Sequence, residues 1–236
     1  MNIALILSGG NGSRLGSAIP KQYIEVNGKP IIGYCLDTFQ KNEFTDKIQI
    51  VADESYHSYI KNYCIKNDIG KLCGFSRQGE SRQLSILNGL KDIIKYAKGG
   101  DIVIIHDAAR PFVSSKLITE SINAVNDEYD GVLPVLPMKD TIYQSNDAKS
   151  ISNLIDRKTL FAGQAPETFK LGKYYNANLK LLPQKILEIN GSTEPAILDN
   201  MKIKLINGDE NNFKITTMSD FERFKNMENN LHYSRI

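Results

Sequence analysis

The sequence predicts an α/β fold whose mostly parallel sheet is covered by helices on both faces. In the first half of the chain, short apolar runs alternate with longer segments of helical spacing. The apolar runs are 4–7, 48–52, 71–75 and 102–105, and the helical segments are 31–39, 56–66, 82–96 and 114–126. This alternation is typical of βαβ units, whose ligands bind beyond the carboxyl ends of the strands. We therefore expect the chemically active residues at that edge.

Length and charge limit the function classes. The 236 residues, of which 41% are hydrophobic, fit one domain spanning 1–236 with a real core. The 29 Lys and Arg residues nearly balance the 27 Asp and Glu residues, so a nucleic-acid partner is not expected. The chain starts directly with a strand and holds no apolar run of membrane-spanning length, which predicts a soluble cytoplasmic protein.

The cysteines predict neither disulfides nor catalysis. Cys35, Cys64 and Cys73 are odd in number, lack C-x-x-C spacing and lie in apolar or mixed stretches. We expect buried free thiols and no cysteine-bound metal.

A glycine-rich loop follows the first strand, Asn2–Leu7. It contains Gly9, Gly10 and Gly12, together with Arg14, and Lys21 follows shortly after. Glycines let backbone N–H groups approach a phosphate chain, and two cations can neutralise its oxygens. The loop therefore predicts a nucleotide triphosphate ligand, although glycines alone would fit an ordinary turn.

Two familiar phosphate loops do not match this segment. In a P-loop, lysine directly follows the last glycine, but here Gly16 precedes Ser17 and Ala18. A dinucleotide-binding turn has the pattern G-x-G-x-x-G, but three residues instead of two separate Gly12 from Gly16.

A second candidate segment follows the strand around 102–105. Asp107 is suited to hold Mg²⁺ against phosphate oxygens, and Arg110 to clamp another phosphate in a bidentate manner. The alternative is an internal Asp–Arg ion pair that closes the strand. Neighbouring His106 is expected to be a structural hydrogen-bonding residue rather than a general base.

Two further segments offer nucleotide contacts. Gly79, Glu80 and Ser85 surround the start of the helical segment 82–96, where they can contact a flat base, cap the helix, or do both. Lys214 is predicted on a late strand, 213–216, among apolar neighbours, where it requires an anion.

No Ser/His/Asp or Cys/His set is present, which argues against acyl transfer. A phosphate monoester that is itself the nucleophile needs no base, only alignment and charge neutralisation.

The pattern changes after Asp130. The segments 131–137, 141–144, 150–154 and 157–163 lack helical spacing and predict a β-arm, 138–163, that projects from the sheet. Its exposed edges predict a homodimer, the alternative being a surface excursion without a partner. Helices near 170–182 and 218–229 flank a final strand region, 202–206 and 213–216.

Together these motifs resemble the cytidylyltransferases that act on 2-C-methyl-D-erythritol 4-phosphate and on D-ribitol 5-phosphate. The resemblance spans nearly the whole chain. It comprises 9–14, 20–22, 82–85, 106–112, 140–141, 156–157, 164–166 and 212–217. It implies a Rossmann-like sheet with a dimerising β-arm, and a reaction that joins CTP and a polyol phosphate into a CDP-polyol with release of pyrophosphate.

The resemblance also implies roles for individual residues. CTP phosphates would be neutralised by three cations, the glycines of the first loop would help to bind the nucleotide, and the acceptor would be bound by four further residues. These are Arg14, Lys21 and Lys214 for catalysis; Gly9, Gly10, Gly12, Gly79, Glu80, Ser85 and Asp107 for the nucleotide; Arg110, Thr141, Arg157 and Thr193 for the acceptor. Asp107 would also hold Mg²⁺, and Arg157 would reach the site of the neighbouring subunit.

The acceptor stays open. Ala108 and Ala109 resemble the methylerythritol branch, but Ala165 stands where that family usually has threonine, and 191–196 departs from its usual threonine and acidic residues. A lost hydroxyl changes which polyol is preferred. Another polyol or sugar phosphate of a capsule pathway, or a nucleotide-binding module without turnover, are the alternatives.

Overall fold

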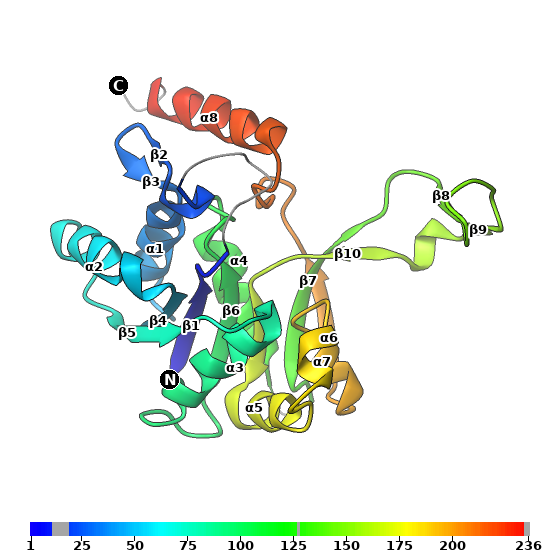
Figure 1. Cartoon of the computed structure of the whole chain (residues 1–236), viewed down its shortest axis with the longest axis horizontal. Coiled ribbons are helices and arrows are strands. Elements are labelled where there is room, and N and C mark those ends of the chain that lie inside the picture. The colour runs from blue at the N-terminus through cyan, green and yellow to red at the C-terminus, as the bar shows by residue number, and fades with distance from the viewer. Residues whose placement is uncertain (11–18, 127, 234–236) are drawn as a thin grey trace.

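The computed structural model describes residues 1–10, 19–126 and 128–233. Within them, one mixed sheet has the order β10-β7-β11-β6-β1-β4-β5, and β12 also pairs with β7 (Figure 1). Its strands are β1 (Asn2–Leu7), β4 (Lys47–Ala52), β5 (Leu72–Arg77), β6 (Ile102–Asp107), β7 (Gly131–Pro137), β10 (Phe161–Gly163), β11 (Glu167–Lys170) and β12 (Ile203–Asn207).

The predicted mostly parallel sheet is confirmed. β1 pairs in parallel with β4 and β6, β4 with β5, and β7 with β12. Only β10 and β11 run against their neighbours in this sheet of the described residues. Since β1, β5 and β6 run in one direction, their carboxyl ends meet at one edge.

Helices cover both faces of the sheet. They are α1 (Ile31–Lys41), α2 (His57–Lys66), α3 (Arg82–Ile93), α4 (Ser115–Ala124), α5 (Leu171–Leu179), α6 (Lys185–Glu188), α7 (Glu194–Leu198) and α8 (Met218–Tyr233), with 3-10 turns Lys21–Tyr23, Glu54–Tyr56 and Arg157–Thr159. In β1, Ala4 and Ile6 pack with α1, α2 and α4, whereas Ile3 and Leu5 pack with α3 and α5. This two-sided burial explains why the strand is a continuous apolar run.

Serine side chains fix the starts of two helices. The Ser81 hydroxyl accepts the Leu84 N–H at 3.1 Å at the start of α3, and Ser114 accepts the Leu117 N–H at 3.1 Å before α4. These caps satisfy N–H groups that have no partner within the helix. The start of α3 is therefore held at the strand-end edge.

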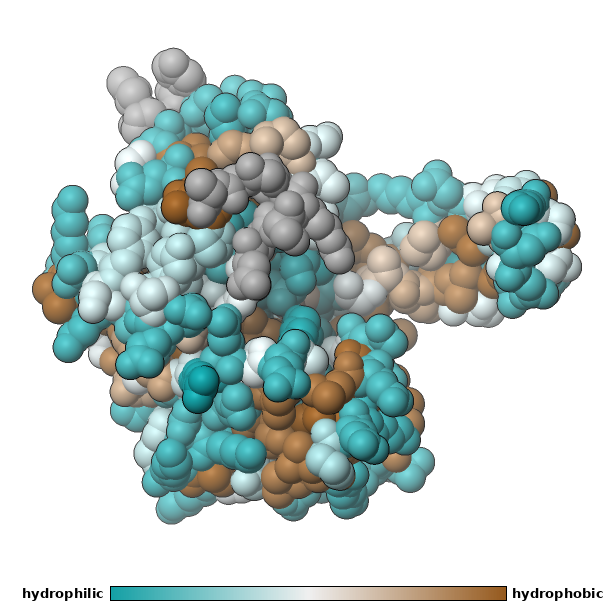
Figure 2. All heavy atoms as spheres, in the orientation of Figure 1, coloured by the Kyte–Doolittle hydropathy of each residue, from teal (hydrophilic) through white to brown (hydrophobic). Residues whose placement is uncertain are grey.

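A β-arm extends from the body between β7 and β10 (Figure 1). Its tip is an antiparallel hairpin of β8 (Ile142–Gln144) and β9 (Asn153–Ile155). Apolar side chains are exposed along it, notably Tyr143, Ile151 and Leu154. Figure 2 shows brown atoms along the arm beyond the body.

The structure corrects one predicted strand. Residues 213–216 have no regular secondary structure, although Phe213 and Ile215 alternate with polar residues. Both pack into a cluster with Phe224 of α8, and the Ile215 N–H donates to the Ala109 carbonyl at 2.9 Å instead of joining a ladder. The sequence prediction also missed β11 and the small hairpin of β2 (Glu25–Val26) and β3 (Lys29–Pro30).

The cysteines are free thiols, as predicted, and Cys35 and Cys64 are buried, but Cys73 is exposed, so its predicted burial was wrong. Among the helices of the described residues, none combines the length and apolarity needed to cross a bilayer.

Candidate active site

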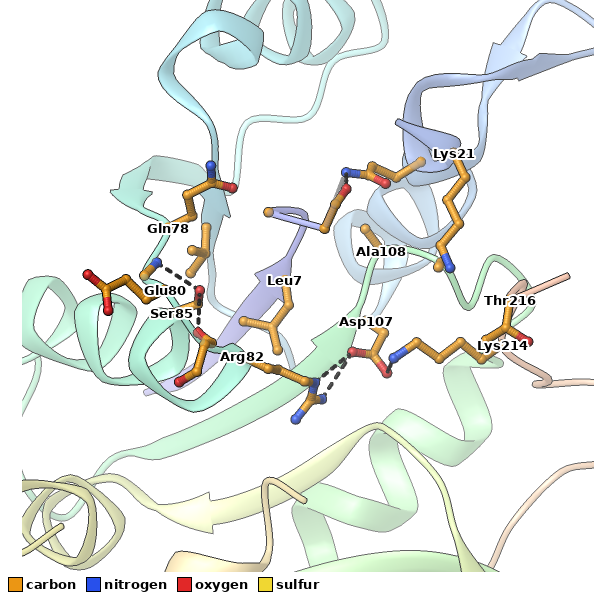
Figure 3. A pocket seen from close by; sticks show the side chains of 17 residues that line it. Leu7, Lys21, Gln78, Glu80, Arg82, Ser85, Asp107, Ala108, Lys214 and Thr216 are labelled. Carbon is orange, nitrogen blue, oxygen red and sulfur yellow. Dashed lines mark hydrogen bonds and ion pairs between the residues drawn. The ribbon is translucent and has the colours of Figure 1, made fainter. Parts of the chain in front are cut away.

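A cavity of about 630 Å³ opens at the carboxyl ends of β1, β5 and β6. Residues from five parts of the chain line it, and Figure 3 shows many of them. They are residues 7, 9 and 10 with 21 and 22, residue 51, residues 78–82 with 85, residues 107–109, and residues 214 and 216. The sequence predicted a site at this edge, and this cavity of the described residues lies there.

Hydrogen bonds from the next turn hold the start of the glycine-rich loop. The Gln22 amide donates to the carbonyls of Ser8 and Gly10 at 2.8 and 2.9 Å. A side chain at Gly9 would place its Cβ 2.8 Å from the Gln78 amide oxygen, so glycine is required there. Lys21 lines the cavity and extends toward Thr216 in Figure 3. The predicted residues Gly12 and Arg14 lie outside the described residues.

The turn before α3 forms another wall. Ser85 accepts the Gly79 N–H at 2.9 Å and donates to the Ser81 carbonyl at 3.0 Å. A Cβ at Gly79 would lie 2.9 Å from the backbone carbon of Leu84, which explains the glycine. Ser85 thus braces the turn while lining the cavity, and Glu80 lies exposed at its rim.

Asp107 is the electrostatic centre of the site. Its Oδ1 lies 3.0 Å from Nη2 of Arg82, and its Oδ2 lies 3.1 Å from Nζ of Lys214 and 3.6 Å from Nε of Arg110. In Figure 3, Arg82 and Lys214 approach the carboxylate from opposite sides. Burial acts to raise the pKa of Asp107, but the charges of Arg82, Lys214 and Arg110 outweigh it and hold the pKa well below its usual range.

The alternative interpretation of Arg110 as an ion-pair partner of Asp107 fits the geometry. Arg110 does not line the cavity; its Nη1 donates to the Asn212 carbonyl at 2.6 Å. It therefore contacts Asp107 while also holding the segment that leads to Lys214.

Arg82 has a place in the site that the sequence prediction missed. It sits at the first position of α3, lines the cavity, and its Nη1 donates to the Ser192 hydroxyl. An arginine in the first turn of a helix at the ligand edge was an available signal.

Buried Glu167 at the start of β11 also went unnoticed. It accepts hydrogen bonds from the hydroxyls of Ser192 at 2.8 Å and Thr193 at 2.6 Å. Burial raises the pKa of Glu167 and outweighs the opposing influence of Arg82. Thr193, predicted to contact the acceptor, is buried against Glu167 and does not line the cavity.

The two arm residues of the predicted site lie apart from this cavity. Thr141 and Arg157 are exposed, and Nη1 of Arg157 donates to the Lys139 carbonyl at 2.5 Å. The structure therefore brings together Gly9, Gly10, Lys21, Gly79, Glu80, Ser85, Asp107 and Lys214, with Arg110 behind them, but not Thr141 or Arg157.

His106 is structural, as expected. It is fully buried, its Nε2 lies 3.0 Å from the Arg110 carbonyl, and its ring packs edge-on against Phe39. Burial lowers the pKa of His106 to about 4, so the ring is neutral. Because its ring is fully buried and does not line the cavity, His106 cannot reach a substrate proton there.

The described residues contain no group of three or more His, Cys, Asp or Glu side chains able to enclose a metal ion. Magnesium, however, requires only one or two carboxylates when phosphate oxygens and water complete its shell. Asp107 lines the cavity and fits that requirement.

Comparison with known proteins identifies relatives of this chain. The family model for IspD, 2-C-methyl-D-erythritol 4-phosphate cytidylyltransferase, matches residues 2–227. A protein of that description from Lachnospira eligens is 36% identical over 226 residues, covering 94% of this chain and 96% of the relative. A ribitol-5-phosphate cytidylyltransferase from Streptococcus agalactiae is 32% identical over 226 residues, covering 95% of this chain and 94% of the relative.

Solved structures show the same fold. The 4-diphosphocytidyl-2C-methyl-D-erythritol synthase of Anaerococcus prevotii superposes with a TM-score of 0.81 at 26% identity, covering 97% of this chain and 95% of that one. The Francisella tularensis 2-C-methyl-D-erythritol 4-phosphate cytidylyltransferase superposes with a TM-score of 0.77 at 24% identity, covering 95% of this chain and 100% of that one. The resemblance stated from the motifs is confirmed, and the chain belongs to the 2-C-methyl-D-erythritol 4-phosphate cytidylyltransferase family of nucleotidyltransferases.

Proposed function

We propose that this protein transfers the cytidylyl group of CTP to a polyol phosphate. A phosphate oxygen of the acceptor attacks the α-phosphorus, a new P–O bond forms, and the bond to the β-phosphate breaks to release pyrophosphate. The observation that carries the proposal is the cluster of Lys21, Arg82, Lys214 and Asp107 in one strand-end cavity, in a chain related to cytidylyltransferases of both kinds.

The cations supply the chemistry. A phosphate monoester is already an anion, so no base is needed, and charge builds on the phosphate oxygens in the transition state. Lys21, Lys214 and Arg14 would neutralise it. Lys214 is held by Asp107 at 3.1 Å, so its ammonium group is in place before the nucleotide arrives.

The nucleotide contacts follow the walls of the cavity. Backbone N–H groups around Gly9, Gly10 and Gly12 would approach the phosphates. On the opposite wall, Gly79, Glu80 and Ser85 would surround the cytidine, since the turn before α3 offers little side-chain bulk to a flat base.

Magnesium would be held by Asp107. One carboxylate together with phosphate oxygens satisfies the ion, which would neutralise further charge on the triphosphate. To hold the ion, Oδ2 of Asp107 must release its contact with Lys214. The bound triphosphate would then supply the anion that Lys214 contacts instead. Removal of divalent cations by EDTA is expected to abolish turnover, and Mg²⁺ to restore it.

The acceptor side involves the arm. We propose a homodimer in which the arm of one copy packs on the other, so that Thr141 and Arg157 approach the neighbouring cavity. The exposed position of both residues supports this arrangement. Arg110 and Thr193 would complete the acceptor site. The whole chain, 1–236, would act as one domain, with residues 138–163 as its arm.

Pyrophosphate release from CTP tests the proposal. The acceptors are 2-C-methyl-D-erythritol 4-phosphate, ribitol 5-phosphate, arabinitol phosphate and glycerol 3-phosphate, and UTP and ATP test the base preference. We expect turnover with one of the first two acceptors. CTP binding without turnover on any acceptor would favour the nucleotide-binding module.

The cation variants test the mechanism. Arg14→Ala and Lys21→Ala are each expected to lose on the order of 10²–10³ in rate while remaining folded. Lys116→Ala is the matched control, because its side chain is exposed on α4. Near-normal turnover of either variant would contradict the mechanism.

A further inference from the structure

The segment that carries Lys214 is not part of the sheet, yet its ammonium group lies 3.1 Å from Asp107. An irregular segment holds a side chain in place only if other groups fix its backbone. On the carboxyl-terminal side of Lys214, the Ile215 N–H donates to the Ala109 carbonyl at 2.9 Å, and the contacts on its amino-terminal side fix the chain that leads to it.

On the amino-terminal side, the Gln164 amide forms a two-point contact with the backbone of Asp209. Its Oε1 accepts the Asp209 N–H at 2.9 Å, and its Nε2 donates to the Asp209 carbonyl at 3.0 Å. The Gln164 side chain thereby imitates a neighbouring strand. It is only 6% exposed, so water competes little for these bonds.

Gly208 lies directly against this contact. A Cβ at Gly208 would be 2.4 Å from Oε1 of Gln164 and 3.2 Å from its Cδ. Only glycine leaves room for the amide in its observed position. The Gln164 amide and the turn at 208–212 are therefore in close contact, with no space for an added side chain between them.

The residue after Gln164 extends the same anchor. The Ala165 carbonyl accepts a hydrogen bond from the Asn212 side chain at 2.6 Å, and the Asn212 carbonyl accepts one from Arg110 at 2.6 Å. Asn212 is fully buried and precedes Lys214 by two residues. Gln164 and Ala165 thus fix both ends of the turn that leads to Lys214.

We propose that Gln164 is a positioning residue for nucleotidyl transfer: its amide fixes the turn at 208–212 and thereby the position of the Lys214 ammonium group in the cavity. The inference rests on the proposed function, in which Lys214 neutralises the triphosphate. Gln164 itself does not line the cavity and acts through Lys214. Since it follows β10 directly, it ties Lys214 to the strand that returns from the arm.

A double-mutant cycle tests this. A misplacement of about 1 Å can cost up to about 10²-fold in rate, so Gln164→Ala is expected to lower kcat/KM for CTP by about ten- to hundredfold. In a Lys214→Ala background the same change is expected to add less than about twofold, because the group that it positions is gone. A purely structural role would lower kcat/KM equally in both backgrounds, which would overturn the inference.

The cycle separates this inference from the proposed function. If Lys214→Ala keeps normal turnover, the role of Lys214 itself is wrong. If Lys214→Ala loses activity while Gln164→Ala does not, only the positioning role is wrong. Circular dichroism and thermal melting establish that each variant is folded.

A second variant probes the same contact with Lys214 and Gln164 in place. Gly208→Ala is expected to displace the Gln164 amide and lower kcat/KM by about tenfold, and to add little to Gln164→Ala. Gly70→Ala is the matched control, because no heavy atom lies within 4 Å of its added Cβ. Equal kinetics for Gly208→Ala and Gly70→Ala would contradict the inference.

Discussion

Nζ of Lys214 lies 3.1 Å from Oδ2 of Asp107, and this contact joins an irregular segment near the end of the chain to the end of the central strand β6. The same carboxylate also faces Arg82 and Arg110. One buried anion therefore contacts three cations, of which Arg82 and Lys214 line the cavity, and a single carboxylate offsets only part of their charge.

Asp107→Asn is expected to reduce both stability and turnover. The substitution leaves three cations without their counter-charge. Removing one partner of a fully buried ion pair costs about 3–5 kcal/mol in free energy of unfolding. We expect about 2 kcal/mol, because the side chains of Arg82 and Lys214 are 31% and 35% exposed. Urea unfolding at pH 7 measures the free energy of unfolding. Glu43→Gln, an exposed position outside the cavity, is the control and is expected to change neither stability nor turnover.

The difference in free energy of unfolding between wild type and Asp107→Asn should depend on pH in one direction only. The folded-state pKa of Asp107 is depressed by its cations, so its stabilisation is complete above the ordinary value of about 3.9 and is lost as the pH falls further. The gap between wild type and Asp107→Asn should therefore be constant from pH 7 to about pH 5 and narrow below about pH 4. A gap that narrows between pH 7 and 5 would contradict the assignment.

Glu167→Gln is expected to stabilise the protein at neutral pH. Burial raises the folded-state pKa of Glu167, so its ionised form is penalised in the fold. An uncharged amide accepts one of the Ser192 and Thr193 hydroxyls on its oxygen and donates to the other through its NH2 group. The gain should shrink as the pH falls through the raised pKa and vanish below the ordinary value of about 4.3. Urea unfolding between pH 8 and 4 measures it, and a destabilised variant at pH 8 would refute this account.

His106→Gln is expected to remove an acid sensitivity. Burial lowers the folded-state pKa of His106 to about 4, while the unfolded chain binds the proton near pH 6.5. Wild-type stability should therefore fall by about 3 kcal/mol between pH 6.5 and 4 from this group alone. Glutamine keeps a donor for the Arg110 carbonyl and does not titrate. Parallel losses of stability in both proteins would exclude His106 as the cause.

Leu154→Asp is expected to convert a dimer into a monomer and to reduce turnover. The Leu154 side chain is 60% exposed on the arm, and a charge there would be buried if a second copy covered it. Light scattering coupled to size exclusion measures the mass at micromolar concentration. Asn146→Asp adds the same charge at the exposed turn of the arm and should leave the mass unchanged. A monomeric wild-type protein would contradict the proposed dimer.

The alternation of strands and helices could be predicted because each parallel strand is buried on both faces. Ile3 and Leu5 face one helical layer and Ala4 and Ile6 the other, so the strand appears as an unbroken apolar run. Residues 213–216 misled the prediction because Phe213 and Ile215 alternate as in a strand, yet pack against Phe224 rather than a sheet neighbour. Antiparallel β11 was missed because it is short and begins with Glu167 and Thr168.

By itself, the sequence determined the fold class, the edge where the cavity opens and the family, because glycines, cations and apolar periodicity are local properties that keep their order along the chain. Only the tertiary structure decided that Arg82 and Lys214 share the carboxylate of Asp107, that Glu167 holds Thr193, and that Gln164 braces the turn before Lys214. These contacts join residues far apart in the chain, and their energies depend on distance and burial, which no local pattern encodes.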